Sequence, residues 1–404
     1  MMEKLFYQDT HMIDFEATVL DCVAAEQPGQ YFIVLDRTAF FPEEGGQFAD
    51  KGTLNGQTVL DVQIKGLQDT VGEELIFHLV DTPIPVGTKV TGHVDWTQRF
   101  DFMQQHSGEH IISGLVHKHF GYDNVGFHLG YEEVTLDFNG ELTLDQLRAI
   151  EAEANEAVWK NLPIYTSFPN EEALAKLNYR SKLDLTENVR IVEIPGIDVC
   201  ACCAPHVDTT AQIGLIKITN VQNHRGGVRV NILCGERAVK DYTTKQDSVS
   251  AISVLLSAKP GEVANAVNRL MSENAKQKER TNALQAELLN LQLQALPEPV
   301  SKTAAPDSSN ATAQNVLLFV GELDNIAMRN AVNTITAKYA GYCGIFSGDD
   351  QSGYRFIIGS SVLDCRELAT RMREAFQAKG GGSVPMIQGT VIATKDALTD
   401  FFQN

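Results

Sequence analysis

Hydrophobic and polar positions alternate along the first 95 residues, where short β-rich runs are separated by Gly, Pro, Asn and Asp. Such runs predict strands at residues 30–35, 52–64, 75–80 and 89–95. Short strands joined by turn residues are typical of a small barrel or sandwich. We therefore expect an N-terminal β-barrel-like domain over residues 1–95.

The pattern changes to a helical period at Trp96, with Phe102, His106 and His110 roughly on one face of a helix that ends near residue 120. A second helix is expected at 143–160, with Thr143 as its N-cap. Further strands are expected at residues 190–194, 213–221 and 227–233. Together these elements predict an α+β domain over residues 96–242.

The last 160 residues contain a long helical stretch, a linker and a compact end domain. Apolar positions in 261–295 follow a 4-3 spacing with polar residues in its middle, so a helical hairpin and a dimer arm both stay open for a helical arm over 243–296. Residues 297–313 are rich in Pro, Ser, Ala and Thr and predict a flexible linker. Strands at 316–320, 342–347 and 354–358 with helices at 327–338 and 364–377 predict a C-terminal α/β domain over 314–404.

Composition and charge narrow the class of protein. The formal net charge of −19 argues against nucleic-acid binding over the whole surface, so an RNA partner requires a local basic patch. No apolar run approaches the roughly 18 residues of a membrane helix, and the N-terminus lacks an apolar signal core. We expect a cytoplasmic protein with no membrane partner.

Cysteine usage points to thiolate chemistry rather than to disulfides. The seven cysteines are an odd number in a long chain, and three of them crowd together at Cys200, Cys202 and Cys203. Near them, Cys202-Cys-Ala-Pro-His206 separates a thiol and an imidazole by three residues. In the predicted helix, His106-Ser-Gly-Glu-His110 puts two imidazoles on one face, one turn apart. One thiolate and three imidazoles are a ligand set that suits zinc.

Four stretches of the chain resemble the editing domain shared by alanyl-tRNA synthetase and the free-standing AlaX editing proteins. They are Thr38-Ala-Phe-Phe-Pro-Glu-Glu-Gly-Gly-Gln47 followed by Asp50 and Gly52, Arg99 to His110, Ile194-Pro-Gly-Ile-Asp198 followed by Cys202 to His206, and Gly226-Gly-Val-Arg229 followed by Gly235. Residues 314–404 are similar to the C-terminal domain that the synthetase and the long AlaX proteins carry. The likeness therefore extends over most of the chain.

The resemblance implies a zinc-dependent hydrolase that removes serine or glycine from wrongly charged tRNA for alanine. The ion would be held by His106, His110, Cys202 and His206. The partner would be that tRNA, and the C-terminal domain would bind tRNA or form a homodimer. Because no class II aminoacylation domain precedes the matching region, we expect no aminoacylation by this chain.

The sequence departs from the family pattern at two places. Glu109 stands where Gln or Thr is more usual, and Cys-Ala-Pro replaces Gly-Gly-Thr inside the Cys202 to His206 loop. Both changes alter the surroundings of the ligands and leave the ligands themselves in place. If all four residues bind, they fill the tetrahedron and zinc only orients groups. If Cys202 or His206 leaves the ion, zinc can activate a bound water molecule, so both roles stay open.

Three residues are candidates for contact with substrate or water. Glu109 could act as general base on the attacking water, or could simply face solvent. Thr38 could hydrogen-bond the serine hydroxyl that alanine lacks, or could only begin the turn before Phe40. Gln47, after two glycines, could hold the ester carbonyl or the terminal ribose, or could belong to a tight turn.

Arg225 and Arg229 form a small basic group that could meet tRNA phosphates, or could lie at a solvated hairpin tip. Two rival functions stay open. His106, Glu109 and His110 fit the H-x-x-E-H pattern of inverted zinc peptidases, with Glu187 or Glu193 as the third ligand. Alternatively, a closed zinc site stabilises a non-catalytic tRNA-binding module.

Overall fold

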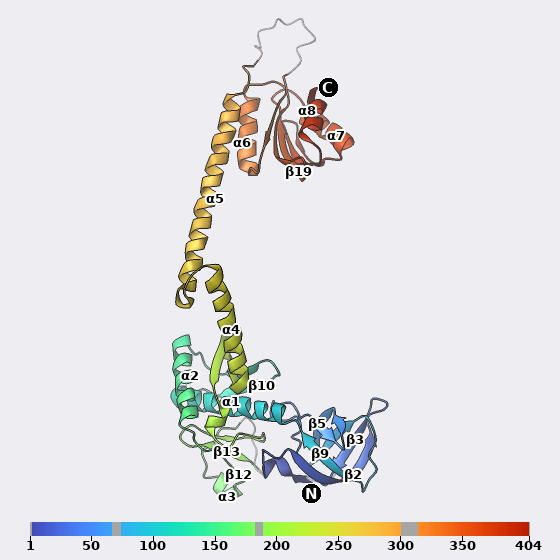
Figure 1. Ribbon diagram of the computed structural model, residues 1–404, viewed down its shortest axis with the longest axis vertical. Coiled ribbons are helices and arrows are strands. Elements are labelled where there is room, and N and C mark those ends of the chain that lie inside the picture. The colour runs from blue at the N-terminus through green and yellow to red at the C-terminus, as the bar shows by residue number, and fades with distance from the viewer. Residues whose placement is uncertain (1, 67–73, 182–188, 300–313, 404) are drawn as a thin grey trace. The chain divides into compact units, whose positions relative to one another are not determined.

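The computed structural model describes residues 2–66, 74–181, 189–299 and 314–403. The chain divides into two compact units, residues 1–250 and 251–404. In the first unit, a curled N-terminal sheet lies beside the helix α1 (Trp96–Phe120), as Figure 1 shows. The predicted domain boundaries at residues 95 and 242 stay predictions, and most of the predicted linker lies outside the described residues.

The N-terminal sheet is antiparallel throughout and has the order β6-β5-β9-β2-β3-β8-β7. Its strands are β2 (Asp14–Ala24), β3 (Tyr31–Leu35), β5 (Gly52–Leu54), β6 (Gln57–Val59), β7 (Asp61–Gly66), β8 (Glu74–Val80) and β9 (Lys89–Val94). The edge strand β6 also contacts β8, so the sheet curls nearly into a barrel. This confirms the coarse prediction of a barrel-like N-terminal region.

One strand prediction in this region is wrong, and one strand was not predicted at all. Residues 52–64 are not one strand, because Asn55 (φ 50°) and Gly56 (φ 79°) make a hairpin turn between β5 and β6. Strand β2 was not predicted, although Phe15, Ala17 and Val19 alternate along it and are buried. A short parallel pair, β1 (Glu3–Lys4) and β4 (Arg37–Thr38), and the 3-10 helix η1 (Leu5–Tyr7) accompany the sheet.

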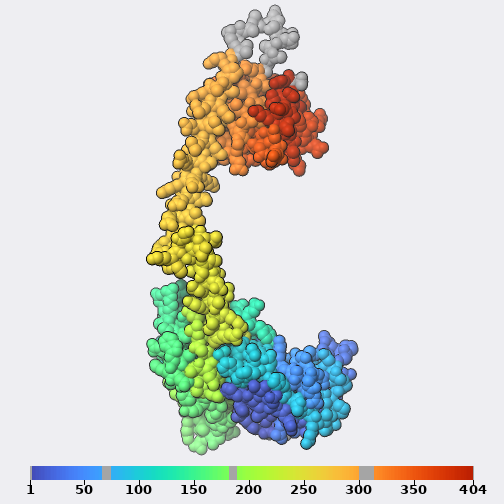
Figure 2. Space-filling view, viewed as in Figure 1, coloured from blue at the N-terminus to red at the C-terminus, as the bar shows by residue number. Residues whose placement is uncertain are grey.

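Helix α1 begins and ends as the sequence predicts. Its N-cap Asp95 accepts a hydrogen bond from the backbone N–H of Gln98, and Gly121 (φ 68°) ends it in the left-handed conformation. The helix packs against α2, β10, β14 and β16 and is buried on most of its circumference along its middle. In the space-filling view the N-terminal residues, in dark blue, lie directly against the cyan segment that contains α1 (Figure 2).

The rest of the first unit surrounds α1 with two small antiparallel sheets. One has the order β10-β11-β16-β15 and the other β12-β13-β14. The elements are β10 (Asn124–Leu129), β11 (Val134–Phe138), α2 (Leu144–Trp159), β12 (Tyr165–Ser167), α3 (Glu171–Leu174), β13 (Ile191–Ile194), β14 (Asp198–Ala201), η2 (Thr210–Ile213), β15 (Ile216–His224), β16 (Gly227–Cys234) and α4 (Gly235–Leu255). Helix α2 has the predicted N-cap, Thr143, in a capping box with Gln146.

The elements of this region differ from the expected ones at three places. The strand expected at 213–221 starts only at Ile216, because residues 210–213 form a 3-10 helix. Strands β10 and β11 were not predicted. Helix α4 starts at Gly235, earlier than the expected helical arm.

The second unit is a five-stranded sheet covered by helices on both faces. Its order is β17-β18-β19-β21-β20, with β17 and β18 parallel and the other pairs antiparallel. The elements are η3 (Pro260–Glu262), α5 (Val263–Gln294), β17 (Val316–Val320), α6 (Asn325–Thr336), β18 (Cys343–Asp349), β19 (Gly353–Gly359), α7 (Cys365–Phe376), β20 (Lys379–Ser383), β21 (Met386–Val391) and α8 (Lys395–Gln403).

Alternation along β18 and β19 divides the core of this unit. Ile345 and Ile357 pack in the cluster that contains residues of α6, whereas Phe346 and Phe356 pack in the cluster that contains residues of α7 and α8. The chain is thus a mixed α and β protein, as predicted. Every helix within the described ranges is too short or too polar to cross a lipid bilayer.

Candidate metal centre

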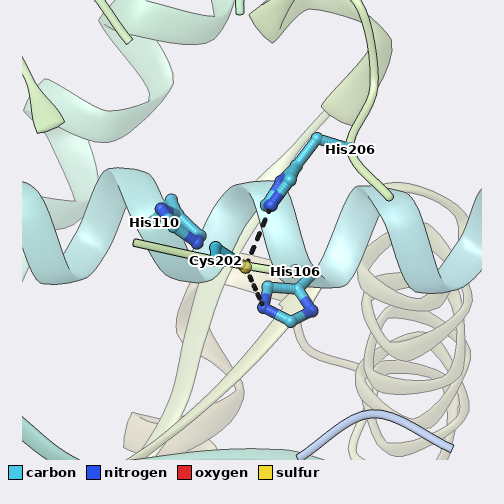
Figure 3. A group of neighbouring side chains, drawn as sticks. All are labelled: His106, His110, Cys202 and His206. Carbon is cyan, nitrogen blue, oxygen red and sulfur yellow. Dashed lines mark hydrogen bonds between the residues drawn. The ribbon is translucent and has the colours of Figure 1, made fainter. Parts of the chain in front are cut away.

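Four side chains from two distant segments meet beside α1. The ligand atoms of His106, His110, Cys202 and His206 all lie within 4.8 Å of one another (Figure 3). The three imidazoles are buried, and Cys202 is partly buried. His106 and Cys202 are 96 positions apart in the sequence, and the fold brings the two pairs of side chains together.

The spacing inside the cluster matches a tetrahedral zinc site. The Cys202 Sγ atom lies 3.5 Å from His106 Nε2 and 3.4 Å from His206 Nε2. A tetrahedral ion with bonds of about 2.0 Å to nitrogen and 2.3 Å to sulfur separates the two donor atoms by roughly 3.5 Å. The residues therefore fit zinc in both donor type and spacing.

The first half of the cluster comes from α1. His106 and His110 are four residues apart on this helix, and their ring centroids are 5.7 Å apart. Close packing around α1 depends on two glycines. A Cβ atom at Gly108 would meet Cys234 Sγ at 2.3 Å, and one at Gly114 would meet the Ile197 carbonyl at 2.6 Å. Neighbouring elements can therefore press against the helix and hold the two imidazoles in place.

The second half comes from the loop after β14. Arg190 Nη1 donates hydrogen bonds to the carbonyl oxygens of Cys202 (3.0 Å) and Ala204 (2.8 Å). The Cys202 backbone N–H donates to the Arg190 carbonyl at 3.0 Å. These bonds hold the loop in the shape that presents the Cys202 thiol and the His206 ring.

The Nδ1 atom of each imidazole lies within hydrogen-bond distance of a residue outside the group of four candidate ligands. His106 Nδ1 lies 2.9 Å from Gln47 Oε1, His110 Nδ1 lies 2.8 Å from Asp198 Oδ2, and His206 Nδ1 lies 3.0 Å from Ser107 Oγ. Amide and carboxylate oxygens only accept, so the Nδ1 atoms of His106 and His110 carry the hydrogen and their Nε2 atoms are left for an ion. Outer partners of this kind are characteristic of histidine ligands to metals.

Electrostatics favours a thiolate at the centre. Burial alone would raise the pKa of Cys202, but the three neighbouring imidazoles, His106 first, hold it well below the ordinary range. Burial lowers the pKa of His206 to about 3. A thiolate beside imidazoles is the protonation state that binds a cation.

The sequence around these ligand atoms is similar to that of known proteins. The family model described as "Threonyl and Alanyl tRNA synthetase second additional domain" matches residues 189–231, which include Cys202 and His206. The model described as "tRNA synthetases class II (A)" matches residues 3–98. The chain is 31% identical over 285 residues to "Alanyl-tRNA editing protein AlaX-L" of Pyrococcus horikoshii, with 67% of this chain and 69% of that protein covered. The chain belongs to the AlaX-L family of alanyl-tRNA editing proteins.

The chain also matches relatives of nearly its own length and relatives that are more than twice as long. It is 29% identical over 404 residues to "Alanyl-tRNA editing protein Aarsd1" of Rattus norvegicus, with 96% of this chain and 94% of that protein covered. It is 28% identical over 402 residues to "Alanine--tRNA ligase" of Methanopyrus kandleri, where it covers 42% of the ligase. The C-Ala domain from Aquifex aeolicus alanyl-tRNA synthetase matches at 17% identity and a TM-score of 0.20, too low to establish a shared fold.

Glu109 lies beside the four candidate ligands of this chain and is only 4% exposed. Its Oε1 atom accepts hydrogen bonds from Asn124 Nδ2 (2.6 Å) and Ser113 Oγ (2.7 Å), and its Oε2 atom is 3.7 Å from His110 Nε2. The alternative that Glu109 faces solvent is wrong. Its role as general base stays a prediction.

Gln47 is in contact with the cluster through His106 and is 1% exposed. Gly45 (φ 64°) and Gly46 (φ 82°) form the turn before it, and a Cβ atom at Gly46 would meet the Phe127 carbonyl at 2.7 Å. The Gln47 Nε2 group is buried and has no hydrogen-bond partner among the residues that the structure describes. Buried orphan donors are rare and mark places where a ligand or water binds.

Thr38 lies in the core of the N-terminal sheet and is fully buried. Its Oγ1 atom is 2.8 Å from His78 Nε2 and accepts a hydrogen bond from the Phe40 backbone N–H at 3.1 Å. The bond from Phe40 belongs to the turn that Thr38 was alternatively expected to begin. Contact of Thr38 with the amino acid stays a prediction.

The two arginines of the predicted basic group differ in their surroundings. Arg225 (φ 46°) is exposed in the turn between β15 and β16. Arg229 is held by Asp137 on β11, with hydrogen bonds of 2.6 and 2.7 Å. Only Arg225 is therefore available to phosphate without the loss of an existing ion pair.

The third ligand proposed for a peptidase does not join the cluster. Glu193 is exposed on β13, and Glu187 lies outside the described residues. Cys202 and His206 occupy that side of the two helical histidines instead. The peptidase interpretation therefore gains no support.

Two residues that orient a candidate ligand, Asp198 and Arg180, were not predicted from the sequence. Asp198 orients His110 and is held in turn by Arg180 through bonds of 2.8 and 2.9 Å. This accounts for a second group of neighbouring donors, His110, Asp198 and Cys200, as part of the same site. Asp198 ends the motif Ile194-Pro-Gly-Ile-Asp198, and a carboxylate in such a motif is a candidate partner for a histidine ligand.

Arg99 and Asp50 form a buried ion pair that ties the glycine-rich segment to α1. Arg99 donates to both carboxylate oxygens of Asp50 and to the carbonyls of Ala39 and Thr10, while Asp50 accepts from the Phe41 backbone N–H. Both side chains are almost completely buried. The pair sets the position of the segment that carries Gln47.

Proposed function

We propose that this chain hydrolyses the ester bond of wrongly charged tRNA for alanine, with Zn²⁺ as cofactor and serine or glycine as the amino acid removed. The observation that carries the proposal is the convergence of three imidazoles and a thiolate in a member of the AlaX-L family. No aminoacylation is proposed for the chain.

His106, His110, Cys202 and His206 would hold the ion. When bound, zinc supplies a fixed positive charge that orients and polarises groups around it, because four protein donors fill a tetrahedral site. Gln47, Asp198 and Ser107 hold the three imidazoles in the required orientation.

Gln47 is proposed to bind the ester carbonyl oxygen. Its Nε2 group, next to His106, is a buried donor for which the described part of the chain offers no partner. An oriented donor at this place stabilises the negative charge that develops on the carbonyl oxygen when water attacks. The orphan group would then be satisfied in the complex.

Glu109 is proposed as the general base. Ser113 and Asn124 hold one of its carboxylate oxygens, so that the side chain keeps a fixed orientation beside the cluster. In this proposal the carboxylate takes a proton from water, the water oxygen bonds to the ester carbon, and the ribose oxygen leaves with a proton. Thr38 is proposed to recognise the serine hydroxyl.

The tRNA partner would meet the chain at local basic positions, since the net charge is −19. Arg225 is exposed and available for phosphate, whereas Arg229 would first have to leave Asp137. The second unit, residues 251–404, is proposed to bind tRNA or to form a homodimer.

The test is deacylation of seryl-, glycyl- and alanyl-tRNA by the wild type and by Glu109→Gln, with metal content measured in both. We expect hydrolysis of the first two substrates and little of the third. Glu109→Gln should keep its zinc and lose roughly 10²–10⁴-fold in rate. Glu156→Gln, at an exposed glutamate on α2, is the matched control.

Two outcomes would overturn the proposal. Wild-type protein that binds tRNA but hydrolyses none of the three substrates would favour a non-catalytic module. Wild-type protein without metal would remove the basis of the site.

A further inference from the structure

His78 is a buried histidine outside the metal cluster, on β8 in the N-terminal sheet. It is fully buried, with Nδ1 3.0 Å from the Ile33 carbonyl oxygen and Nε2 2.8 Å from Thr38 Oγ1. Its ring stands edge-on to Phe40 at 5.6 Å between centroids. Neither of its two polar contacts involves a charged group.

The contact with Ile33 determines which nitrogen carries the hydrogen. A carbonyl oxygen can only accept, so Nδ1 must be the donor. Burial lowers the pKa of His78 to about 4, so the ring is neutral near pH 7. The Nε2 atom is then without a hydrogen and can only accept.

The hydroxyl of Thr38 is oriented by this arrangement. Its single hydrogen must point to His78 Nε2, and one lone pair of Oγ1 takes the Phe40 backbone N–H. Among the contacts of the described residues, the remaining lone pair has no partner. The hydroxyl can therefore offer only an acceptor to anything that approaches it.

We infer that His78 is a positioning residue for amino-acid selection, because it makes the Thr38 hydroxyl an obligate hydrogen-bond acceptor that selects an amino acid with a hydroxyl donor. The inference rests on the proposed function. Serine can donate to such an acceptor, whereas alanine and glycine have no hydroxyl to donate. The contact therefore separates serine from alanine and takes no part in the removal of glycine. A hydroxyl free to rotate would select less strongly, because it could offer either role.

The experiment compares seryl-tRNA with glycyl-tRNA hydrolysis by His78→Leu, His78→Gln, Thr38→Val and the double variant His78→Leu with Thr38→Val. His78→Leu should lower kcat/KM for seryl-tRNA by about tenfold and leave glycyl-tRNA almost unchanged, because only serine uses the hydrogen bond. His78→Gln, whose amide oxygen can accept from Thr38, should restore much of the loss. The double variant should be no worse for seryl-tRNA than Thr38→Val alone.

Equal losses on both substrates, or additive losses in the double variant, would overturn the inference. Nitrogen NMR of the His78 imidazole in the wild type is a second measurement that needs no variant. It should find a protonated Nδ1 and a bare Nε2, and the opposite tautomer would overturn the inference as well. A wild type that hydrolyses neither substrate would refute the proposed function, and with it the assigned selection, while the tautomer of His78 stays testable.

Discussion

The two halves of the candidate metal centre are built on different kinds of backbone. His106 and His110 stand one turn apart on α1, a helix in which 16 of 25 residues are buried. Cys202 and His206 stand in a loop whose carbonyl groups are held by one side chain, Arg190. The helical half takes its geometry from packing, whereas the loop half takes it from a few hydrogen bonds.

This difference indicates how the site assembles. Packing of α1 against its neighbours places the two imidazoles without an ion, so the helical half would need little ordering entropy to bind one. The loop half has fewer constraints and would gain more order from an ion. We therefore expect the two halves to respond differently to mutation.

The largest expected effect is loss of the ion when either half loses a ligand. Cys202→Ala and His106→Ala each remove one corner of the tetrahedron, so both should bind almost no zinc, against about one per chain in the wild type. Elemental analysis measures this directly. Cys203→Ala, at the neighbouring cysteine, should keep its zinc, and a loss there equal to that of Cys202→Ala would contradict the ligand assignment.

A smaller effect is expected when the outer partner of a ligand changes. Asp198→Asn weakens the acceptor of His110 and the ion pair with Arg180, so zinc affinity should fall roughly 10–100-fold in a competition with a chelator. Ser107→Ala removes only a neutral hydroxyl beside His206 and should cost less. A greater loss for Ser107→Ala would contradict the assignment of Asp198 as the stronger outer partner.

The smallest effect is expected for the loop support itself. Arg190→Met removes the donors to the Cys202 and Ala204 carbonyls. It also removes a buried cation whose Nη2 group has no hydrogen-bond partner within the described ranges. The free energy of unfolding in urea should fall by only about 1 kcal/mol. Zinc release to excess chelator should nevertheless become faster than in Arg148→Met, an exposed control on α2. Unchanged release would show that Arg190 does not support the loop.

The sequence revealed the helical half more readily than its surroundings. Spacing of four on a helix is a local property that periodicity detects, and the helix expected from Trp96 to near residue 120 is confirmed as α1. The burial of Glu109 was not detectable in this way, because α1 is covered on most of its circumference and has no clear polar face. Likewise, the Asn55-Gly56 turn that divides two strands was present in the sequence but was overlooked.

Contacts between distant residues explain most of what could not be predicted. Asp198 lies 88 positions from His110, and Arg190 reaches two backbone carbonyls that carry no sequence signature at all. Such contacts depend on the sheet β12-β13-β14 being placed against α1, which no local pattern specifies. The ligand types were therefore predictable, while the groups that orient them were not.

The buried pair of Arg99 and Asp50 also has an evolutionary consequence. One partner belongs to α1 and the other to the glycine-rich segment of the N-terminal sheet, and each would be an uncompensated buried charge without its mate. Recombination that exchanged one of these regions for a version lacking the matching residue would yield an unstable hybrid. We therefore expect either region, when exchanged alone, to destabilise the chain unless the matching residue is exchanged with it.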